Sequence, residues 1–172
     1  HVPGLDRGGW HDAGDDDLRV ESQAETMHGL ALLYEMYKVD YDNTTIDEQN
    51  RVVEIHCPDG KPDLLQQIEH GALSVVGGYK SLGRLYRGII VPDLRQYVHL
   101  GEFGSVTDNR VFEPPASGRP PAIPLPGSAD DRWVFTEDNP KRELDVAGCL
   151  AAASRPLHAL NPALADDCLR IA

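Results

Sequence analysis

The stretch Gly8–Asp17, which reads GGWHDAGDDD, concentrates four aspartates, a histidine, a tryptophan and three glycines in ten residues. Like charges this close together repel one another unless another interaction offsets or uses them. Asp12 and Asp15 are separated by Ala-Gly, and small residues of this kind allow a tight turn that brings two carboxylates toward one point. Asp16 and Asp17 follow where helical periodicity begins, at the positive end of a helix dipole. The stretch therefore predicts an acidic loop that leads into a helix.

Apolar residues recur at helical spacing in two segments after this loop. Their spacing predicts a first helix over about residues 18–39 and a second that begins near Pro62 and ends near Leu82. The two apolar stripes consist of Val20, Ala24, Met27, Ala31 and Tyr34, and of Leu65, Ile68, Ala72, Val75, Tyr79 and Leu82. The paired Gly77 and Gly78 weaken the second helix locally and predict a close approach of another backbone.

The remainder of the chain reads as loops and two further helices. Residues 88–101 are compatible with a short extended piece or a helical turn, and residues 113–131 contain six prolines, which predicts a loop excursion over the surface. The Ala-rich segment after Glu143 has helical spacing, and we expect Pro156 to stop that helix and Pro162 to start a last one. Because no long strand alternation is present, we predict an all-α chain of paired helices.

Length and charge limit the function classes. The 172 residues are the size of one domain, but the first residue is His1 and the last, Ala172, falls inside a helical pattern, so we expect an internal fragment. The formal net charge of −12 argues against a nucleic-acid backbone or an anionic membrane surface as partner. A neutral or cationic substrate is more compatible with this charge. The sequence contains no apolar run of the roughly 18 residues that a membrane span requires.

The cysteines and histidines do not predict a metal site. Three cysteines, Cys57, Cys149 and Cys168, lack CxxC spacing and are interpreted as packed or free thiols. No two histidines share a helix face at the spacing that binds zinc, so none is assigned as a ligand. The histidines considered in this way are His56, His70, His99 and His158.

The acidic cluster has three interpretations from spacing alone. The aspartates could cap a helix and solvate its start, which is common at helix termini. They could form a calcium loop, although they lack the alternating spacing and the bidentate Glu of an EF-hand loop. They could also be catalytic, because hydrolysis of a glycosidic bond uses one ionised carboxylate to draw a proton from water and a protonated acid on the other side of the sugar. A second nearby aspartate can orient that water.

The segment GGWHDAGD closely resembles the N-terminal active-site motif of glycoside hydrolase family 9, the inverting endoglucanases, in which Tyr is more usual at the His11 position. Further segments resemble the family in the same order along the chain. These are KPDLLQQIEHGALSVV, YVHLG, FTEDNPKRE and ELDVAGCLAAASRPL. The resemblance implies that residues 1–172 are the N-terminal half of a catalytic domain and form part of an (α/α)6 barrel, the six-hairpin glycosidase toroid.

The resemblance also implies an activity, which is inverting hydrolysis of a β-1,4-linked glucan or a related polysaccharide. It implies that Asp15 is the general base and that Asp12 is the second water-binding carboxylate. Trp10 and His11 belong to the same motif and are candidate substrate-binding residues, and Trp10 could either stack on a sugar or anchor the loop in the core. The general acid of the family lies beyond Ala172, so we expect the fragment alone to be inactive.

The expected partners are a polysaccharide or oligosaccharide and the missing C-terminal half of the domain, without nucleic acid or membrane. No cofactor or metal is expected in the fragment, although the full domain could hold a structural calcium. By family resemblance the protein would be secreted, periplasmic or on the cell surface. Tyr97, Trp133 and Phe135 are the aromatic residues that could face a saccharide, with core packing as the alternative. Two other hypotheses remain open: a non-catalytic carbohydrate-binding protein and a calcium-stabilised helical interaction module.

Overall fold

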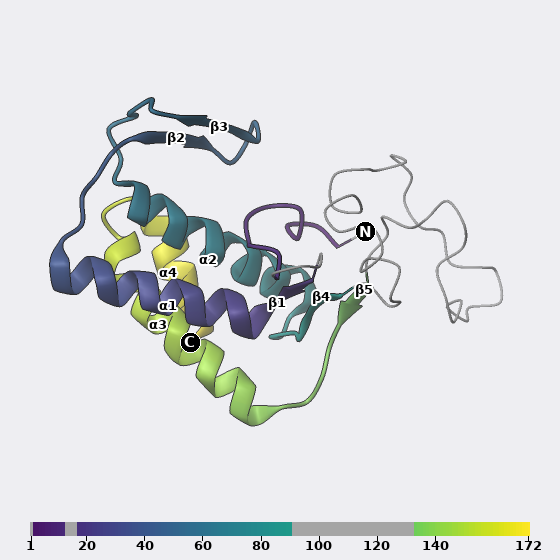
Figure 1. The fold of residues 1–172 in the computed structure, drawn as a ribbon. Helices are drawn as coiled ribbons and strands as arrows, with labels where there is room; N and C mark the ends of the chain where they lie inside the picture. The colour runs from purple at the N-terminus through teal and green to yellow at the C-terminus, as the bar shows by residue number, and fades with distance from the viewer. Residues whose placement is uncertain (1, 13–16, 91–132) are drawn as a thin grey trace, which may run out of the picture.

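The computed structural model describes residues 2–12, 17–90 and 133–172. Within these ranges the chain forms four helices and five short strands (Figure 1). The helices are α1 (Val20–Tyr37), α2 (Asp63–Leu82), α3 (Pro140–Leu157) and α4 (Pro162–Ile171). The strands are β1 (Leu18–Arg19), β2 (Thr44–Asp47), β3 (Val52–Ile55), β4 (Gly88–Ile90) and β5 (Trp133–Phe135). The proline-rich segment 113–131, together with Tyr97, His99 and Asp15, lies outside the described residues.

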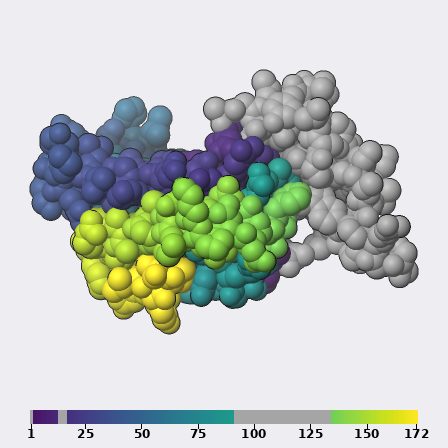
Figure 2. Space-filling view, turned by 90° about the horizontal axis from the view of Figure 1, so that it is seen from below, coloured from purple at the N-terminus to yellow at the C-terminus, as the bar shows by residue number. Residues whose placement is uncertain are grey.

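The helices pack around one apolar core. α1 packs against α2 and α3, and α4 packs against α3 and α2. Figure 2 shows α1 and α3 lying alongside each other with α4 beyond α3. The apolar stripes predicted for the first two helices face this core, since Met27, Ile68 and Val75 have no exposed surface. Cys168 of α4 is also fully buried, and this burial raises the pKa of its thiol to about 12. The two predicted N-terminal helices are therefore confirmed.

The helix ends follow from local sequence. Gly83 ends α2 with a φ of 71° and donates its N–H to the carbonyl oxygen of Tyr79, a left-handed cap that glycine adopts without strain. α3 and α4 each begin with an Asn-Pro pair, in which the side chains of Asn139 and Asn161 accept a backbone N–H of the first turn. Pro156 was expected to stop α3, but the helix continues to Leu157. A proline near the end of a helix removes a hydrogen bond only from its last turn, so that turn persists.

The expectation of an all-α chain is confirmed only in part, because two small antiparallel sheets accompany the four helices in the described residues. β1, β4 and β5 form one sheet in the order β1-β4-β5, which joins segments far apart in the sequence at the end of the molecule where α1 begins (Figure 1). The ambiguous segment after Gly88 is therefore extended at its start. β2 and β3 form a hairpin with Thr44 opposite Ile55. The strands have two to four residues each. Such short strands do not produce an alternating apolar-polar pattern that can be recognised in the sequence.

The predicted close approach at the paired glycines of α2 is confirmed. A Cβ added to Gly77 would lie 2.2 Å from the carbonyl oxygen of Gly4, so a side chain cannot fit there. A Cβ added to Gly78 would lie 2.1 Å from the ring of Tyr86. Tyr86 is buried and donates its hydroxyl to the carbonyl oxygen of Ser74 at 3.0 Å. The glycines therefore hold the N-terminal segment and the chain after α2 against the same helix.

The described part of the chain includes no helix that is both long and apolar enough to span a membrane.

Candidate functional site

The loop that carries the acidic motif lies directly on the backbone of α2. Gly8 and Gly9 have φ values of 68° and 87°, a left-handed conformation that side-chain-bearing residues seldom adopt. A Cβ on Gly8 would lie 2.1 Å from the carbonyl oxygen of His70, so the approach requires glycine. The N–H of Gly9 donates to that same carbonyl oxygen at 2.9 Å. The Gly-Gly pair thus allows the backbone of the loop to lie directly against the backbone of α2.

A buried glutamine from α1 holds the next residue from the other side. The side-chain oxygen of Gln23 accepts the backbone N–H of Trp10 at 2.7 Å, and its side-chain amide donates to the carbonyl oxygen of Trp10 at 2.7 Å. Gln23 is only 2% exposed. A buried amide whose donor and acceptor are both satisfied fixes a backbone segment in one orientation. Trp10 is therefore positioned by both α1 and α2.

The side chain of Trp10 is half-buried and anchored on α2. Its Nε1–H donates to Oε1 of Gln67 at 3.1 Å, and its ring covers Gly71, where an added Cβ would lie 2.8 Å from two ring carbons. The ring centroid lies 5.5 Å from that of His70. Trp10 also lines a pocket. The indole is therefore anchored on α2 and still in contact with solvent.

Two aspartates of the motif share one arginine. Arg19 Nε lies 3.3 Å from a carboxylate oxygen of Asp12, and Arg19 Nη2 lies 3.4 Å from a carboxylate oxygen of Asp17. The backbone N–H of Asp12 donates to the carbonyl oxygen of Asp17 at 2.9 Å, which closes the acidic loop. The Asp17 side chain is buried, whereas that of Asp12 is 27% exposed and can meet solvent. Asp12 is thus ion-paired but still accessible.

The predicted base, Asp15, lies outside the described residues, so its distance from Asp12 is not part of the described geometry. His11 is exposed. Of the aromatic candidates, Phe135 is 39% exposed on β5. Of the four predicted site residues, the structure therefore describes Trp10, His11 and Asp12.

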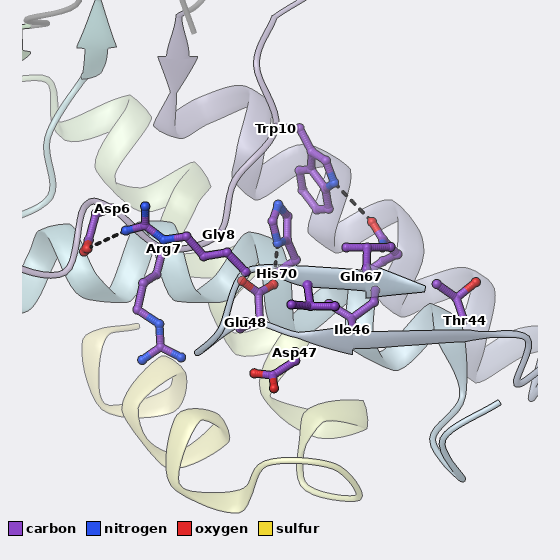
Figure 3. A pocket seen from close by; sticks show the side chains of 13 residues that line it. Asp6, Arg7, Gly8, Trp10, Thr44, Ile46, Asp47, Glu48, Gln67 and His70 are labelled. Atoms are coloured by element: carbon purple, nitrogen blue, oxygen red, sulfur yellow. Dashed lines mark hydrogen bonds and ion pairs between the residues drawn. The ribbon is translucent and has the colours of Figure 1, made fainter. Parts of the chain in front are cut away.

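A pocket of about 470 Å³ opens beside Trp10, between the N-terminal loop, the β2–β3 hairpin and α2 (Figure 3). Its apolar wall includes Ile46, Val52 and Val53, and its polar wall includes His70. His70 Nδ1 lies 2.5 Å from Oε1 of Glu48, and His70 Nε2 lies 2.8 Å from the carbonyl oxygen of Gly9. The charged residues that line the pocket are Asp6, Arg7, Asp47, Glu48 and Arg51.

Sequence reasoning missed Arg19, Gln23, Gln67 and His70. His70 was examined only as a metal ligand, and the described residues contain no group of three or more His, Cys, Asp or Glu side chains that could hold a metal ion. Gln23 lies on the buried face of α1 among its apolar residues, and Gln67 is a partly buried residue next to Ile68 of α2. A polar residue on the edge of a buried stripe is the sequence signal for a side chain that fixes a neighbouring loop.

No protein-family model and no curated protein sequence matches the chain. Solved structures do match it. A single mutant of the thermostable endoglucanase from Alicyclobacillus acidocaldarius superimposes with a TM-score of 0.58 at 18% sequence identity over 95% of this chain. A metagenome-derived glycoside hydrolase family 9 endoglucanase superimposes with a TM-score of 0.58 at 20% identity over 95% of this chain. The fold is that of a segment of these endoglucanases.

The resemblance read from the sequence is thus confirmed at the level of the fold. The chain spans 26% and 24% of the length of the two endoglucanase chains, which is about a quarter of each. These shares refer to the whole endoglucanase chains, so the expectation that residues 1–172 are the N-terminal half of a catalytic domain stays a prediction. Identities this low relate the backbones and leave the chemistry to be argued from the residues of this chain.

Proposed function

We propose that this chain supplies the water-activating side of an inverting glycoside hydrolase that cleaves a β-1,4-linked glucan or a related polysaccharide. Asp15 would be the general base and Asp12 the carboxylate that orients the attacking water, while Trp10 and His11 would contact the substrate. The general acid would come from residues outside this chain. The observation that carries the proposal is the segment GGWHDAGD at the entry to α1, in a fold matched by endoglucanases.

The described geometry supports this assignment in two ways. The segment before the aspartates is fixed by hydrogen bonds from both α1 and α2, which is the preorganisation that water activation requires. The Asp12 carboxylate is partly exposed beside a guanidinium, so it can be both charged and accessible. A polysaccharide substrate also suits a chain with a net charge of −12, since a neutral glucan is not repelled. Such a substrate would be met outside the cell or at its surface.

The test is substitution of the base in the full-length protein that carries these residues. We expect Asp15→Asn to lower turnover of a soluble β-1,4-glucan by about 10²–10⁴-fold with little change in binding, because the loss of a positioned base acts on the proton transfer. Asp12→Asn should lower kcat to a smaller extent. Release of reducing ends measures turnover, and calorimetry with a cello-oligosaccharide measures binding.

Asp40→Asn is the matched control, because Asp40 is an exposed aspartate after α1 and outside the motif. Retained activity in Asp15→Asn would remove the assigned role. Proton NMR of the first product tests the stereochemistry, since an inverting enzyme releases the α-anomer from a β-linkage. A wild-type protein that binds the oligosaccharide without turnover would instead support the non-catalytic carbohydrate-binding alternative.

A further inference from the structure

His70 connects three parts of the site that are distant in sequence. It is on α2, its Nδ1 lies 2.5 Å from Glu48 at the end of β2, and its Nε2 lies 2.8 Å from the carbonyl oxygen of Gly9 in the motif loop. Its own carbonyl oxygen accepts the N–H of Gly9 at 2.9 Å. One residue therefore contacts both polar backbone groups of Gly9.

The two partners of the ring are both hydrogen-bond acceptors. A carboxylate and a carbonyl have no hydrogen to give, and a neutral imidazole carries only one N–H. In either neutral tautomer one ring nitrogen would present a lone pair to an oxygen less than 3 Å away. Only the doubly protonated ring donates at both positions, and charge-assisted hydrogen bonds of this kind are the stronger class.

The contact with Gly9 acts on the same peptide group that Gln23 holds. The carbonyl oxygen of Gly9 and the N–H of Trp10 belong to one planar peptide unit. The ring of His70 contacts the carbonyl oxygen of this unit, and Oε1 of Gln23 accepts its N–H at 2.7 Å. Rotation of this unit would change the direction in which the chain continues to Asp12. The unit is therefore held at both of its polar ends, two residues before Asp12.

We propose that His70, as an imidazolium held by Glu48, is a positioning residue that fixes the Gly9–Asp12 segment for the hydrolytic role of that segment. The inference rests on the proposed function for its effect on turnover, but the arrangement itself is independent of turnover. His70 does not contact the reacting atoms in this assignment. It acts through the Gly9 carbonyl group.

The charge around the ring is mixed. The hairpin contributes Asp47, Glu48 and Arg51, and the N-terminal loop contributes Asp6 and Arg7. Arg51 is paired with Asp6 at 3.1 Å, which is a second link between the hairpin and the loop.

The experiment uses the full-length protein and two independent readouts. Hydrogen exchange by mass spectrometry is measured on peptides that contain Gly9–Asp12. The kcat and KM for a soluble β-1,4-glucan are measured under the same conditions. The variants are His70→Gln, which keeps one donor, His70→Phe, which keeps none, and Glu48→Gln, which removes the charge.

We expect protection of this segment to fall several-fold from the wild-type protein to His70→Phe. The kcat of His70→Phe should also fall by roughly ten- to a hundredfold with a much smaller change in KM, as is typical of a displaced catalytic group. His70→Gln should recover part of the kcat. His158→Gln is the matched control, since His158 pairs with Asp166 of α4 at 3.5 Å and does not contact the motif loop.

The outcomes separate this inference from the proposed function. If His70→Phe and Glu48→Gln fold, as judged by circular dichroism, and keep wild-type protection, the positioning role is wrong even if the protein hydrolyses glucan. If the variants lose protection as expected but the wild-type protein turns over no glucan, the positioning role stands and the proposed activity fails.

Discussion

Arg19 is the residue on which the charge balance of the acidic loop depends. Its guanidinium lies within 3.4 Å of carboxylate oxygens of both Asp12 and Asp17, and the Asp17 side chain is only 3% exposed. A buried carboxylate needs a charged or hydrogen-bonding partner, because its desolvation would otherwise be costly. Arg19 is also the residue before α1, so it joins the loop, β1 and the helix start. The clustering of aspartates that stands out in the sequence is thus partly offset by one neighbouring cation.

Substitution of Arg19 should destabilise the fold. We expect Arg19→Gln to lower the free energy of unfolding by about 0.5–1.5 kcal/mol, since the buried Asp17 carboxylate loses one charged donor that is itself half exposed. Urea denaturation of the full-length protein measures the change. Arg170→Gln is the control, because Arg170 pairs with Asp167 on α4 with 72% of its side chain exposed. Equal losses in the two variants would contradict the role assigned to Arg19.

At the level of single residues, the sequence located the motif but not its supports. Asp12 and Trp10 were predicted from the motif, and the structure places both in one fixed loop. His70 could not be assigned in advance, because its ring partners are 22 and 61 residues away along the chain. Pattern analysis along a chain detects ligands that share a helix face, and it does not detect partners that only tertiary packing brings together.

The elements differ in how clearly the sequence encodes them. α1 and α2 have 18 and 20 residues, long enough for a repeated apolar stripe to specify a buried face. The β2–β3 hairpin carries β-branched residues in both strands, yet Val53 and Ile55 are 63% and 71% exposed. Without one buried and one exposed face, the hairpin lacks the alternation by which strands are recognised. The three-stranded sheet pairs β1, β4 and β5, which are distant from one another in the sequence.

Two helix glycines offer a matched test of the contact between α2 and the motif loop. Gly71 lies beneath the Trp10 ring, and Gly29 of α1 has open space around its Cβ position. Alanine is favoured over glycine inside a helix by about 1 kcal/mol, so Gly29→Ala should raise the free energy of unfolding by up to that amount. Gly71→Ala should instead lower it by about 1–3 kcal/mol, because the added methyl group displaces an anchored indole.

Thermal unfolding measures both stabilities, and tryptophan fluorescence reports on Trp10. We expect a shifted emission maximum in Gly71→Ala and an unchanged one in Gly29→Ala. If the two alanine variants were equally stabilised, the indole would not rest on Gly71 as described.

For the molecule as a whole, the fold is a set of packed helices joined by ion pairs at their surfaces. Arg155 of α3 donates two hydrogen bonds to the Glu35 carboxylate of α1, at 2.8 and 2.9 Å, and these bonds lower the pKa of Glu35. A lowered folded-state pKa stabilises the fold above the unfolded pKa of about 4.3. That contribution is lost as pH falls through the lower, folded-state value.

Glu35→Gln should therefore lower the free energy of unfolding by about 0.5–1 kcal/mol at pH 7, a modest loss because the pair is partly exposed. The difference from the wild-type protein should close as the pH falls below about 4. Urea titrations between pH 3 and 7 measure the trend, with Glu25→Gln on the exposed face of α1 as the control. A difference that persisted undiminished at the acidic end would show that Glu35 stabilises the fold by something other than its charge.

The contact between Gly4 and Gly77 also bears on how the N-terminal segment is held against α2. At this crossing an added Cβ on Gly4 would lie 3.3 Å from the Cα of Gly77, so the two backbone segments meet with no side chain between them. Joining them closes a loop of roughly seventy residues, an entropic cost that local helix formation does not bear. This cost is offset only if the crossing stays tight, so a side chain at either glycine would also release the start of the motif loop from α2.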